Sequence, residues 1–273
     1  MQGYLLGYLR SKIGVLLVIV FLITGCSSVA NNNLEGDVEN FSEDYSNAVR
    51  YHVTSNFLDL EAVNTYPQKI EKINSEEPYD IILLVENKHY FKLEPVPYER
   101  YSYDDKIAPY LESTEKIQTG TELVSEIAQS FITEGVSVQE VVSKALLYNK
   151  DNIVYDKALQ HILFYNLSKS RSAEETLKLG KGTCLEYANT FIAFMRNLGI
   201  PARLVFGFYK DGDISVYHAW AEFYLKGHGW IPAETQTGKI GIPNSLVKLF
   251  VGRDITDIDL KLYQCNAHYE ILE

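Results

Sequence analysis

The chain has 273 residues, enough for one large domain or two small ones, and its 46% hydrophobic content is typical of a globular protein. The formal net charge of −11 argues against nucleic-acid binding, because phosphate recognition needs a clustered excess of Lys and Arg. Three cysteines are too few for a disulfide scaffold or for a zinc site built from four cysteines. We therefore expect each cysteine to have a role of its own.

Residues 1–25 have the pattern of an export signal, with Arg10 and Lys12 before an apolar run and no acidic residue. The apolar run, 13–23, covers only about half of a hydrocarbon core of roughly 30 Å, so a membrane span is the weaker interpretation. The sequence Leu-Ile-Thr-Gly before Cys26 resembles the lipobox of bacterial lipoproteins. That resemblance implies a lipid on Cys26 and a protein anchored to a bacterial membrane in the cell envelope, facing outward from the cytoplasm. The alternatives are an uncleaved anchor and an ordinary signal peptide.

The remaining chain divides unequally. Loss of the leader makes it still more acidic, so we expect membrane attachment to depend on the lipid rather than on surface charge. Asp80 to Val85 is an apolar run of strand length, and Tyr90-Phe91 a partial second strand. The predicted parts are a signal peptide (1–25), a flexible tether (26–41), an N-terminal module without a legible function (42–114), a main domain (115–250) and a C-terminal extension (251–273).

The main domain begins with helical patterns. Leu123, Ile127 and Phe131 fall on one stripe of a helix. Ser137 with Glu140, and Ser172 with Glu175, have the spacing of capping boxes, which predicts a helix start after each serine. Glycines 180 and 182 end the second of these helices.

Cys184 begins the clearest helix, which ends at Gly199-Ile200-Pro201 and presents one apolar stripe. Arg196 and Asn197 are expected to face away from that stripe. Backbone N–H groups and the helix dipole at a helix N-terminus favour an anion, and the thiolate is the nucleophilic form of cysteine. The position therefore favours a nucleophile, although a free cysteine is often only a small buried hydrophobe.

Two strands follow, over 202–209 and 214–225, and a third segment reaches Glu234. Alternation places His218, Trp220 and Glu222 on one face of the second strand. If the turn after Leu225 has three residues, Glu234 lies diagonally beside His218 on that face; a slip of one residue turns Glu234 away. The register of this hairpin therefore decides whether a His–Glu pair exists.

The other histidines predict no site. His161 is expected to be a partly buried helix residue and His228 a solvated turn residue, and His52 has no apparent partner. No spacing of His, Cys and Asp resembles a metal site, and no Gly-rich phosphate loop occurs. We predict neither a metal nor another cofactor.

Three ordered motifs carry a family resemblance: Gly-Lys-Gly-Thr-Cys ending at Cys184, Tyr-His-Ala-Trp-Ala-Glu around His218, and Gly-Trp-Ile-Pro-Ala-Glu ending at Glu234. They resemble the cysteine, histidine and acid motifs of the transglutaminase-like superfamily. The resemblance implies an α+β fold with a papain-like core, in which a cysteine-bearing helix packs on an antiparallel β-sheet. It leaves the first 110 residues uncovered.

By position, the resemblance makes Cys184 the nucleophile, His218 the general base and acid, and Glu234 the orienting acid, where the family usually has Asp. The expected activity is attack on amide bonds of a protein or peptide substrate through a thioester, followed by hydrolysis or acyl transfer. The alternative is a catalytically inactive binding or scaffold lipoprotein that keeps the fold. Cys265 has no assigned role beyond a small buried residue.

Overall fold

A computed structural model of the protein describes residues 45, 47–74, 76, 78–86, 93–211, 214–258 and 268–272. All of them belong to one compact unit, Val38–Glu273. The predicted signal peptide and tether, Cys26, Tyr90-Phe91 and Cys265 lie outside the described residues. None of the helices in the described part of the chain is long and apolar enough to cross a membrane.

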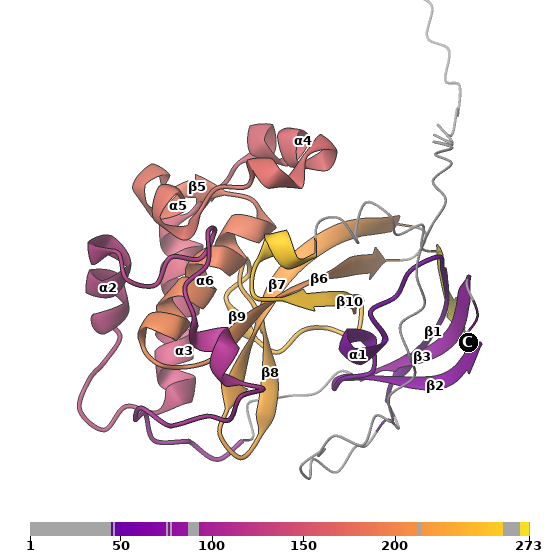
Figure 1. Ribbon diagram of the computed structural model, residues 1–273, viewed down its shortest axis with the longest axis horizontal. Coiled ribbons are helices and arrows are strands. Elements are labelled where there is room, and N and C mark those ends of the chain that lie inside the picture. The colour runs from indigo at the N-terminus through magenta and orange to yellow at the C-terminus, as the bar shows by residue number, and fades with distance from the viewer. Residues whose placement is uncertain are drawn as a thin grey trace, which may run out of the picture. The chain divides into compact units, whose positions relative to one another are not determined.

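A small antiparallel sheet joins the two ends of the described chain, in the order β11-β1-β3-β2 (Figure 1). Its strands are β1 (Val49–Ser55), β2 (Gln68–Asn74), β3 (Tyr79–Val85) and β11 (His268–Leu272). The strand predicted at 80–85 is confirmed as β3. In β1 the side chains of Tyr51 and Val53 face the core, as the alternation of a strand with one buried face requires.

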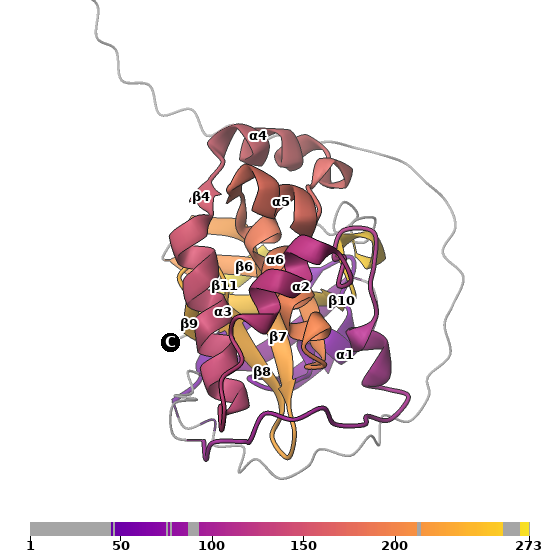
Figure 2. The same cartoon turned by 90° about the vertical axis from the view of Figure 1, so that its left-hand side faces the viewer.

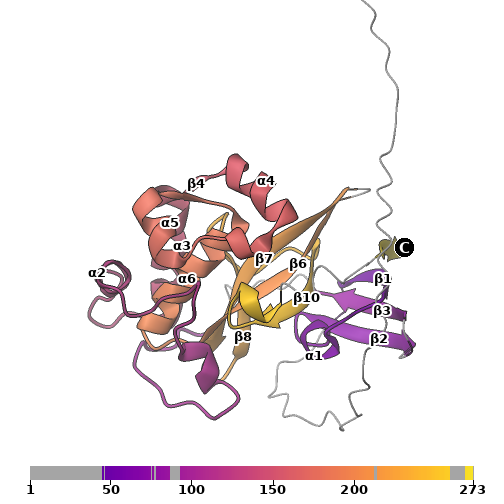
Figure 3. The ribbon, with the colours of Figure 1, turned by 45° about the horizontal axis from the view of Figure 1, so that its top comes forward.

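The central sheet is antiparallel and has the order β10-β6-β7-β8-β9. Its strands are β6 (Ala202–Asp211), β7 (Ile214–Leu225), β8 (Gly229–Glu234), β9 (Lys239–Ile240) and β10 (Leu246–Gly252). It lies between the helices on one side and the small sheet on the other (Figures 1 and 3). A two-stranded parallel pair, β4 (Val154–Tyr155) with β5 (Lys181–Gly182), lies apart from both sheets.

One helix, α6 (Cys184–Asn197), is buried along almost its whole length, from Leu185 to Arg196, and packs on β6 and β7. Helices α2, α3 and α5 surround it (Figure 2). The helices are α1 (Leu60–Val63), α2 (Glu122–Gln129), α3 (Val138–Asn152), α4 (Lys157–Tyr165), α5 (Ala173–Leu179) and α6, with 3-10 turns η2 (Ala108–Leu111), η3 (Leu167–Lys169) and η4 (Ile255–Asp257). This cysteine-bearing helix on an antiparallel sheet confirms the predicted α+β fold class.

Both predicted capping boxes are present. Ser137 caps α3 with Glu140, and Ser172 caps α5 with Glu175. Gly180 ends α5 in the left-handed conformation, with φ of 62°, as its position after the helix predicted.

Arg196 corrects one expectation. It does not face away from the core but is buried, and it donates hydrogen bonds to the carbonyl oxygens of Glu112 (2.8 Å), Ala202 (3.0 Å) and Arg253 (2.6 Å). Burial lowers the pKa of Arg196 to about 10. Two of these carbonyl groups, those of Glu112 and Arg253, come from distant parts of the chain, and the apolar stripe of a helix does not predict such long-range contacts.

The hydrophobic core continues from the small sheet into the central sheet. The hydroxyl of Tyr51 donates to the carbonyl of Asn244 at 2.9 Å, and the Gln68 side chain donates to the carbonyl of Lys248 at 3.0 Å. The N-terminal module thus packs directly on the main domain. The boundaries given for 42–114, 115–250 and 251–273 stay predictions.

Candidate active site

The nucleophile position is fixed by the way in which α6 begins. Thr183 is the N-cap, and Glu186 completes a capping box: both the backbone N–H (2.8 Å) and the hydroxyl (2.7 Å) of Thr183 donate to Glu186 Oε2. Cys184 is therefore the first residue of the helix, and its backbone N–H has no acceptor within the helix. The thiol side chain is partly exposed, in contrast to the buried residues around it.

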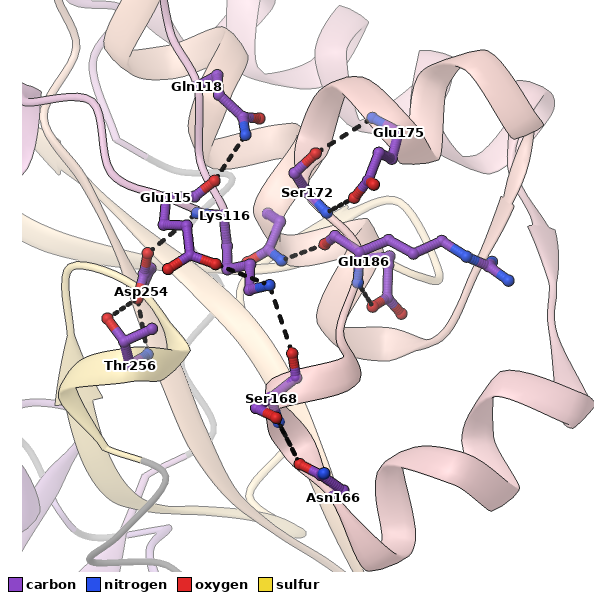
Figure 4. Close-up of polar contacts among 12 residues, drawn as sticks. Glu115, Lys116, Gln118, Asn166, Ser168, Ser172, Glu175, Glu186, Asp254 and Thr256 are labelled. Atoms are coloured by element: carbon purple, nitrogen blue, oxygen red, sulfur yellow. Dashed lines mark hydrogen bonds and ion pairs between the residues drawn. The ribbon is translucent and has the colours of Figure 1, made fainter.

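Glu186 also ties α6 to the chain before α5. Its second oxygen, Oε1, accepts a hydrogen bond from the backbone N–H of Arg171 at 2.9 Å. Figure 4 shows Glu186 beside the capping pair of Ser172 and Glu175, which starts α5. Glu186 is fully buried, and its two oxygens accept hydrogen bonds from Thr183 and Arg171. These contacts hold the first turn of α6 rigidly.

The loop that contains Lys116 makes a second set of contacts near α5. The backbone N–H of Lys116 donates to Asp254 Oδ2 at 3.2 Å, and Asp254 also accepts from the Thr256 hydroxyl at 2.6 Å (Figure 4). The ammonium group of Lys116 donates to the carbonyl of Ser168 at 3.4 Å. These contacts connect the segments around η3 and η4 to one another.

The β7–β8 hairpin has the predicted register. Leu225 pairs with Gly229 and Ala221 with Ala233, which places Glu234 on the face of β7 that carries His218. The Glu234 carboxylate approaches the imidazole, with Oε1 at 3.2 Å from His218 Nε2. The His–Glu pair on which the interpretation of the hairpin depended is therefore present.

The carboxylate of Glu234 is held by the turn that follows β8. Its Oε2 accepts from the backbone N–H of Thr237 at 2.9 Å, and Oε1 accepts from that of Gln236 at 3.3 Å. Burial alone would raise the pKa of Glu234, but the hydrogen bonds from His218 and Thr237 lower it below its usual value. Glu234 is therefore ionised at neutral pH, as a group that orients an imidazole must be.

The imidazole of His218 lies between Glu234 and Cys184. Burial alone would lower the pKa of His218, but hydrogen bonds with the Cys184 thiol and the Glu234 carboxylate, together with their charges, raise it to about 10. Since Nε2 faces Glu234, Nδ1 is the ring nitrogen left for the thiol. The three residues that the sequence singled out thus form one connected cluster, in which a protonated imidazole lies beside the sulfur at neutral pH.

Trp220 and Gly207 shape the surroundings of the His218 imidazole. The Trp220 indole stacks against the imidazole, with ring centroids 6.2 Å apart and an interplanar angle of 24°. Gly207 lies opposite His218 on β6, where a Cβ atom would come within 2.0 Å of the Val247 carbonyl oxygen and 2.8 Å of the Trp220 ring. A side chain at position 207 would therefore clash with the backbone of β10 and with the tryptophan that stacks on His218.

Tyr155 is a candidate site residue that the sequence did not reveal. The parallel β4–β5 pair places it opposite Gly182, two positions before Cys184. Burial, and then the charges of Cys184 and Glu186, raise the pKa of Tyr155 to about 12, so its phenol stays protonated beside the nucleophile. None of the described residues accepts a hydrogen bond from this hydroxyl. Only the pairing of two-residue strands brings it to the site, and no periodicity marks such strands.

Asp156 fixes the β4–β5 pair in place. Its Oδ1 accepts from the backbone N–H groups of Ala158 and Leu159 and so caps α4, while Oδ2 forms an ion pair with Arg171 at 2.9 Å. The backbone hydrogen bond from Leu159 lowers the pKa of Asp156 against the opposing effect of burial, and Arg171 lowers it further. Asp156 is thereby ionised and holds Tyr155 in register with the start of α6.

Comparison with known proteins agrees with this arrangement. The family model described as the Transglutaminase-like superfamily matches residues 125–235, a range that contains Cys184, His218 and Glu234. Residues 125–235 therefore resemble a transglutaminase-like domain. An uncharacterized protein of Haemophilus influenzae is 22% identical over an alignment of 240 residues, and the match covers 71% of this chain and 61% of that protein. The chain therefore spans only about three fifths of the length of this curated relative.

One solved structure has a similar fold. A candidate cysteine protease from Cytophaga hutchinsonii matches with a TM-score of 0.55 and 18% identity over 83% of this chain and 88% of that one. The periplasmic domain of TgpA from Pseudomonas aeruginosa, bound to ethylmercury, matches with a TM-score of 0.42 and 16% identity over 63% of this chain and 65% of that one. At these identities the first likeness supports the fold alone.

The structure thus brings together Cys184, His218 and Glu234, and their catalytic roles stay predictions. Within the described ranges, no group of three or more His, Cys, Asp or Glu side chains could hold a metal ion.

The structure corrects the expectation for His161. This residue is exposed on α4, not partly buried, because the apolar face of α4 is formed by Leu159 and Leu163. His52 has a partner after all, since its Nε2 lies 2.9 Å from Asp80 Oδ1.

Proposed function

We propose that the protein is a membrane-anchored cysteine enzyme that acts on amide bonds of protein or peptide substrates through a thioester on Cys184. The observation that carries the proposal is the connected cluster in which His218 contacts both Cys184 and Glu234. Anchoring through a lipid on Cys26, and a location at the cell envelope, belong to the same proposal and rest on the lipobox-like sequence.

The first half of the reaction uses the sulfur of Cys184 and the protonated imidazole of His218 beside it. The Cys184 thiolate attacks the carbonyl carbon, the C=O π electrons move onto oxygen, and the protonated His218 gives its proton to the leaving amine as the C–N bond breaks. The oxyanion lies near the N-terminus of α6, where the backbone N–H of Cys184 and the phenol of Tyr155 are available as donors. The products are the amine and a thioester on Cys184.

The second half of the reaction depends on a change in the protonation of His218. When the sulfur is acylated its negative charge disappears, so two of the interactions that raise the pKa of His218 are lost and burial acts against protonation. Neutral imidazole then accepts a proton from the attacking water or amine as the new C–O or C–N bond forms. The C–S bond breaks, the sulfur leaves as the thiolate, and the thiolate again lies beside a protonated imidazole. Glu234 keeps the ring in place in both halves. One residue thus serves as acid and then as base without a second titratable group.

The experiment uses the chain from residue 27 onward and peptides that carry Gln and Lys, with mass spectrometry of both protein and peptides. We expect a thioester on Cys184, and with it cleavage, deamidation or cross-linking of the peptides. Cys184→Ala should show none of these products. Products that persist in Cys184→Ala would show that Cys184 is not the nucleophile. A wild-type chain that is acylated neither by the peptides nor by p-nitrophenyl acetate would favour an inactive scaffold.

Tyr155→Phe tests the donor assigned to the oxyanion. We expect acylation by p-nitrophenyl acetate to slow by about 10²-fold, because removal of one oxyanion donor typically costs that much. Alkylation of Cys184 by iodoacetamide should keep its rate, since that displacement forms no oxyanion. Tyr165→Phe, on the exposed side of α4, is the matched control. An equal loss in both reactions would mean that Tyr155 positions the cysteine instead.

A further inference from the structure

Helix α4 presents large apolar side chains to solvent. Phe164 and Tyr165 are 73% and 69% exposed, and Ile162 on the same helix is exposed as well, while Leu159 and Leu163 face the core. The rings of Phe164 and Tyr165 pack edge to face at 5.1 Å between centroids. Contiguous exposed aromatic side chains of this kind mark interaction sites rather than ordinary surface.

A shallow hollow adjoins these side chains. Lys157, Gln160, His161 and Phe164 line it, so a basic group and an aromatic ring share one face of α4. Lys157 has no ion pair with any residue in the described part of the chain. We name Lys157, His161, Ile162, Phe164 and Tyr165 the α4 surface. It combines a free positive charge with apolar side chains.

The charge around α4 is the reverse of that of the whole molecule. The chain has 25 basic and 36 acidic residues, yet the segment 156–181, which starts at the N-cap of α4, carries five basic residues against three acids, Asp156, Glu174 and Glu175. Arg171 and Lys181 form ion pairs with Asp156, and Lys178 forms one with Glu174, so the excess of positive charge lies on Lys157 and Lys169. Lysines beside exposed aromatic and aliphatic side chains are typical of helices that lie in the interface of an anionic bilayer. An otherwise acidic protein would be repelled there, so such a surface selects one orientation.

The chain before the described residues can bring α4 to a membrane. Residues 27–44 reach at most about 60 Å when extended, which exceeds the size of a domain of this length. Helix α4 also lies at the edge of the molecule, above α5 in the view of Figure 2. A protein anchored at Cys26 could therefore place the α4 surface on the bilayer.

We propose that the α4 surface is a second membrane contact, which docks on anionic lipid and holds the N-terminus of α6 next to the bilayer. Phe164, Tyr165 and Ile162 enter the interface, and Lys157 contacts the lipid phosphates. Because α4 follows β4 directly, and β4 pairs with the strand that precedes Cys184, docking turns the nucleophile toward substrates near the membrane. The inference rests on the anchoring proposed above, but its test does not.

The test uses the chain from residue 27 onward, which lacks Cys26 and contains every described element, and vesicles of phosphatidylcholine with or without phosphatidylglycerol. We expect cosedimentation with the anionic vesicles. The double substitution Phe164→Ser and Tyr165→Ser should weaken it at least about tenfold. Lys157→Glu should weaken it about fivefold on anionic vesicles alone. The matched control, Ile73→Ser with Leu147→Ser, removes two other exposed apolar side chains and should bind like the wild type.

Two results would overturn the proposal: a wild-type chain that binds neither vesicle, which would leave the α4 surface to a protein partner, and equal weakening by the α4 and control substitutions. Circular dichroism of each variant separates loss of binding from loss of folding. The assay needs neither lipidation nor an active thiol. Failure of Cys26→Ser to release the full chain from membranes would instead count against the anchor, and failure of acylation against the enzyme.

Discussion

His218→Ala should slow acyl transfer to Cys184 by about 10³-fold, while the protein stays folded. The imidazole has two tasks in the proposed reaction, proton donation to the leaving amine and stabilisation of the thiolate, and removal of a positioned acid and base typically costs 10² to about 10⁴ in rate. The measurement is the initial burst of p-nitrophenolate from p-nitrophenyl acetate, followed by turnover of a Gln peptide once one is identified.

The pH dependence gives a second, independent readout. The pKa of His218 is raised to about 10, so the imidazolium persists from acidic pH up to that value and is lost only as the pH rises through it. Alkylation of the wild-type thiol by iodoacetamide should therefore be faster than that of His218→Ala throughout about pH 6.5 to 9, since the imidazolium beside the sulfur is present at each pH and favours the thiolate. In His218→Ala the alkylation rate should climb across this range, as for an ordinary cysteine.

The same shift affects stability. A histidine whose pKa is higher in the folded state stabilises the fold below its unfolded pKa of about 6.5, and this contribution declines until the pH passes about 10.

His52→Ala is the matched control for the alkylation experiment, because His52 also contacts a carboxylate, Asp80, but lies in the small sheet far from the thiol. If both histidine variants alter thiol alkylation alike, the assigned role of His218 is wrong.

The parts of the site that the sequence predicted are local. A three-residue turn fixes the register of the β7–β8 hairpin, and this alone places Glu234 beside His218. Capping boxes are equally local, since a serine and a glutamate three residues apart carry the whole signal. The helix that begins at Cys184 is set in the same way by Thr183 and Glu186.

The parts that the sequence did not predict depend on distant partners. Tyr155 reaches the site through a parallel pair of two-residue strands, too short for any periodicity. β1 pairs with β11 at the other end of the chain, and nothing within either strand specifies its partner. Arg196 is expected on the outer side of its helix because a stripe pattern counts apolar residues only, whereas its burial depends in part on the carbonyl groups of Glu112 and Arg253, which are far away in the sequence.

Glu222→Gln should destabilise the protein by about 3 to 5 kcal/mol, the largest effect that we expect of a single substitution on stability. The Glu222 carboxylate is completely buried and lies 2.6 Å from the Arg203 guanidinium and 2.8 Å from the Lys248 ammonium, which is itself buried. Burial alone would raise the pKa of Glu222, but these two cations lower it. Neutralising the carboxylate leaves two positive charges facing each other in the core.

The two cations differ in how they tolerate that loss. Arg203 stacks on the Trp230 ring at 4.1 Å, which keeps a favourable contact for its charge. Burial lowers the pKa of Lys248 even with Glu222 present, so without the carboxylate Lys248 is the group expected to lose its proton. The stability of Glu222→Gln should then recover partly as the pH rises toward 10, which the wild type, with its ion pair intact, should not show to the same extent.

Urea denaturation of Glu222→Gln, Lys248→Met and the double variant tests this account. Because Lys248→Met removes the cation that Glu222→Gln leaves unpaired, the double variant should be less destabilised than the sum of the single variants by at least about 1 kcal/mol. Additive losses would show that Glu222 stabilises the fold through packing or Arg203 alone. Glu222 lies on the face of β7 that carries His218 and Trp220, so the same cycle followed by acylation rate asks whether this buried network also holds the imidazole in place.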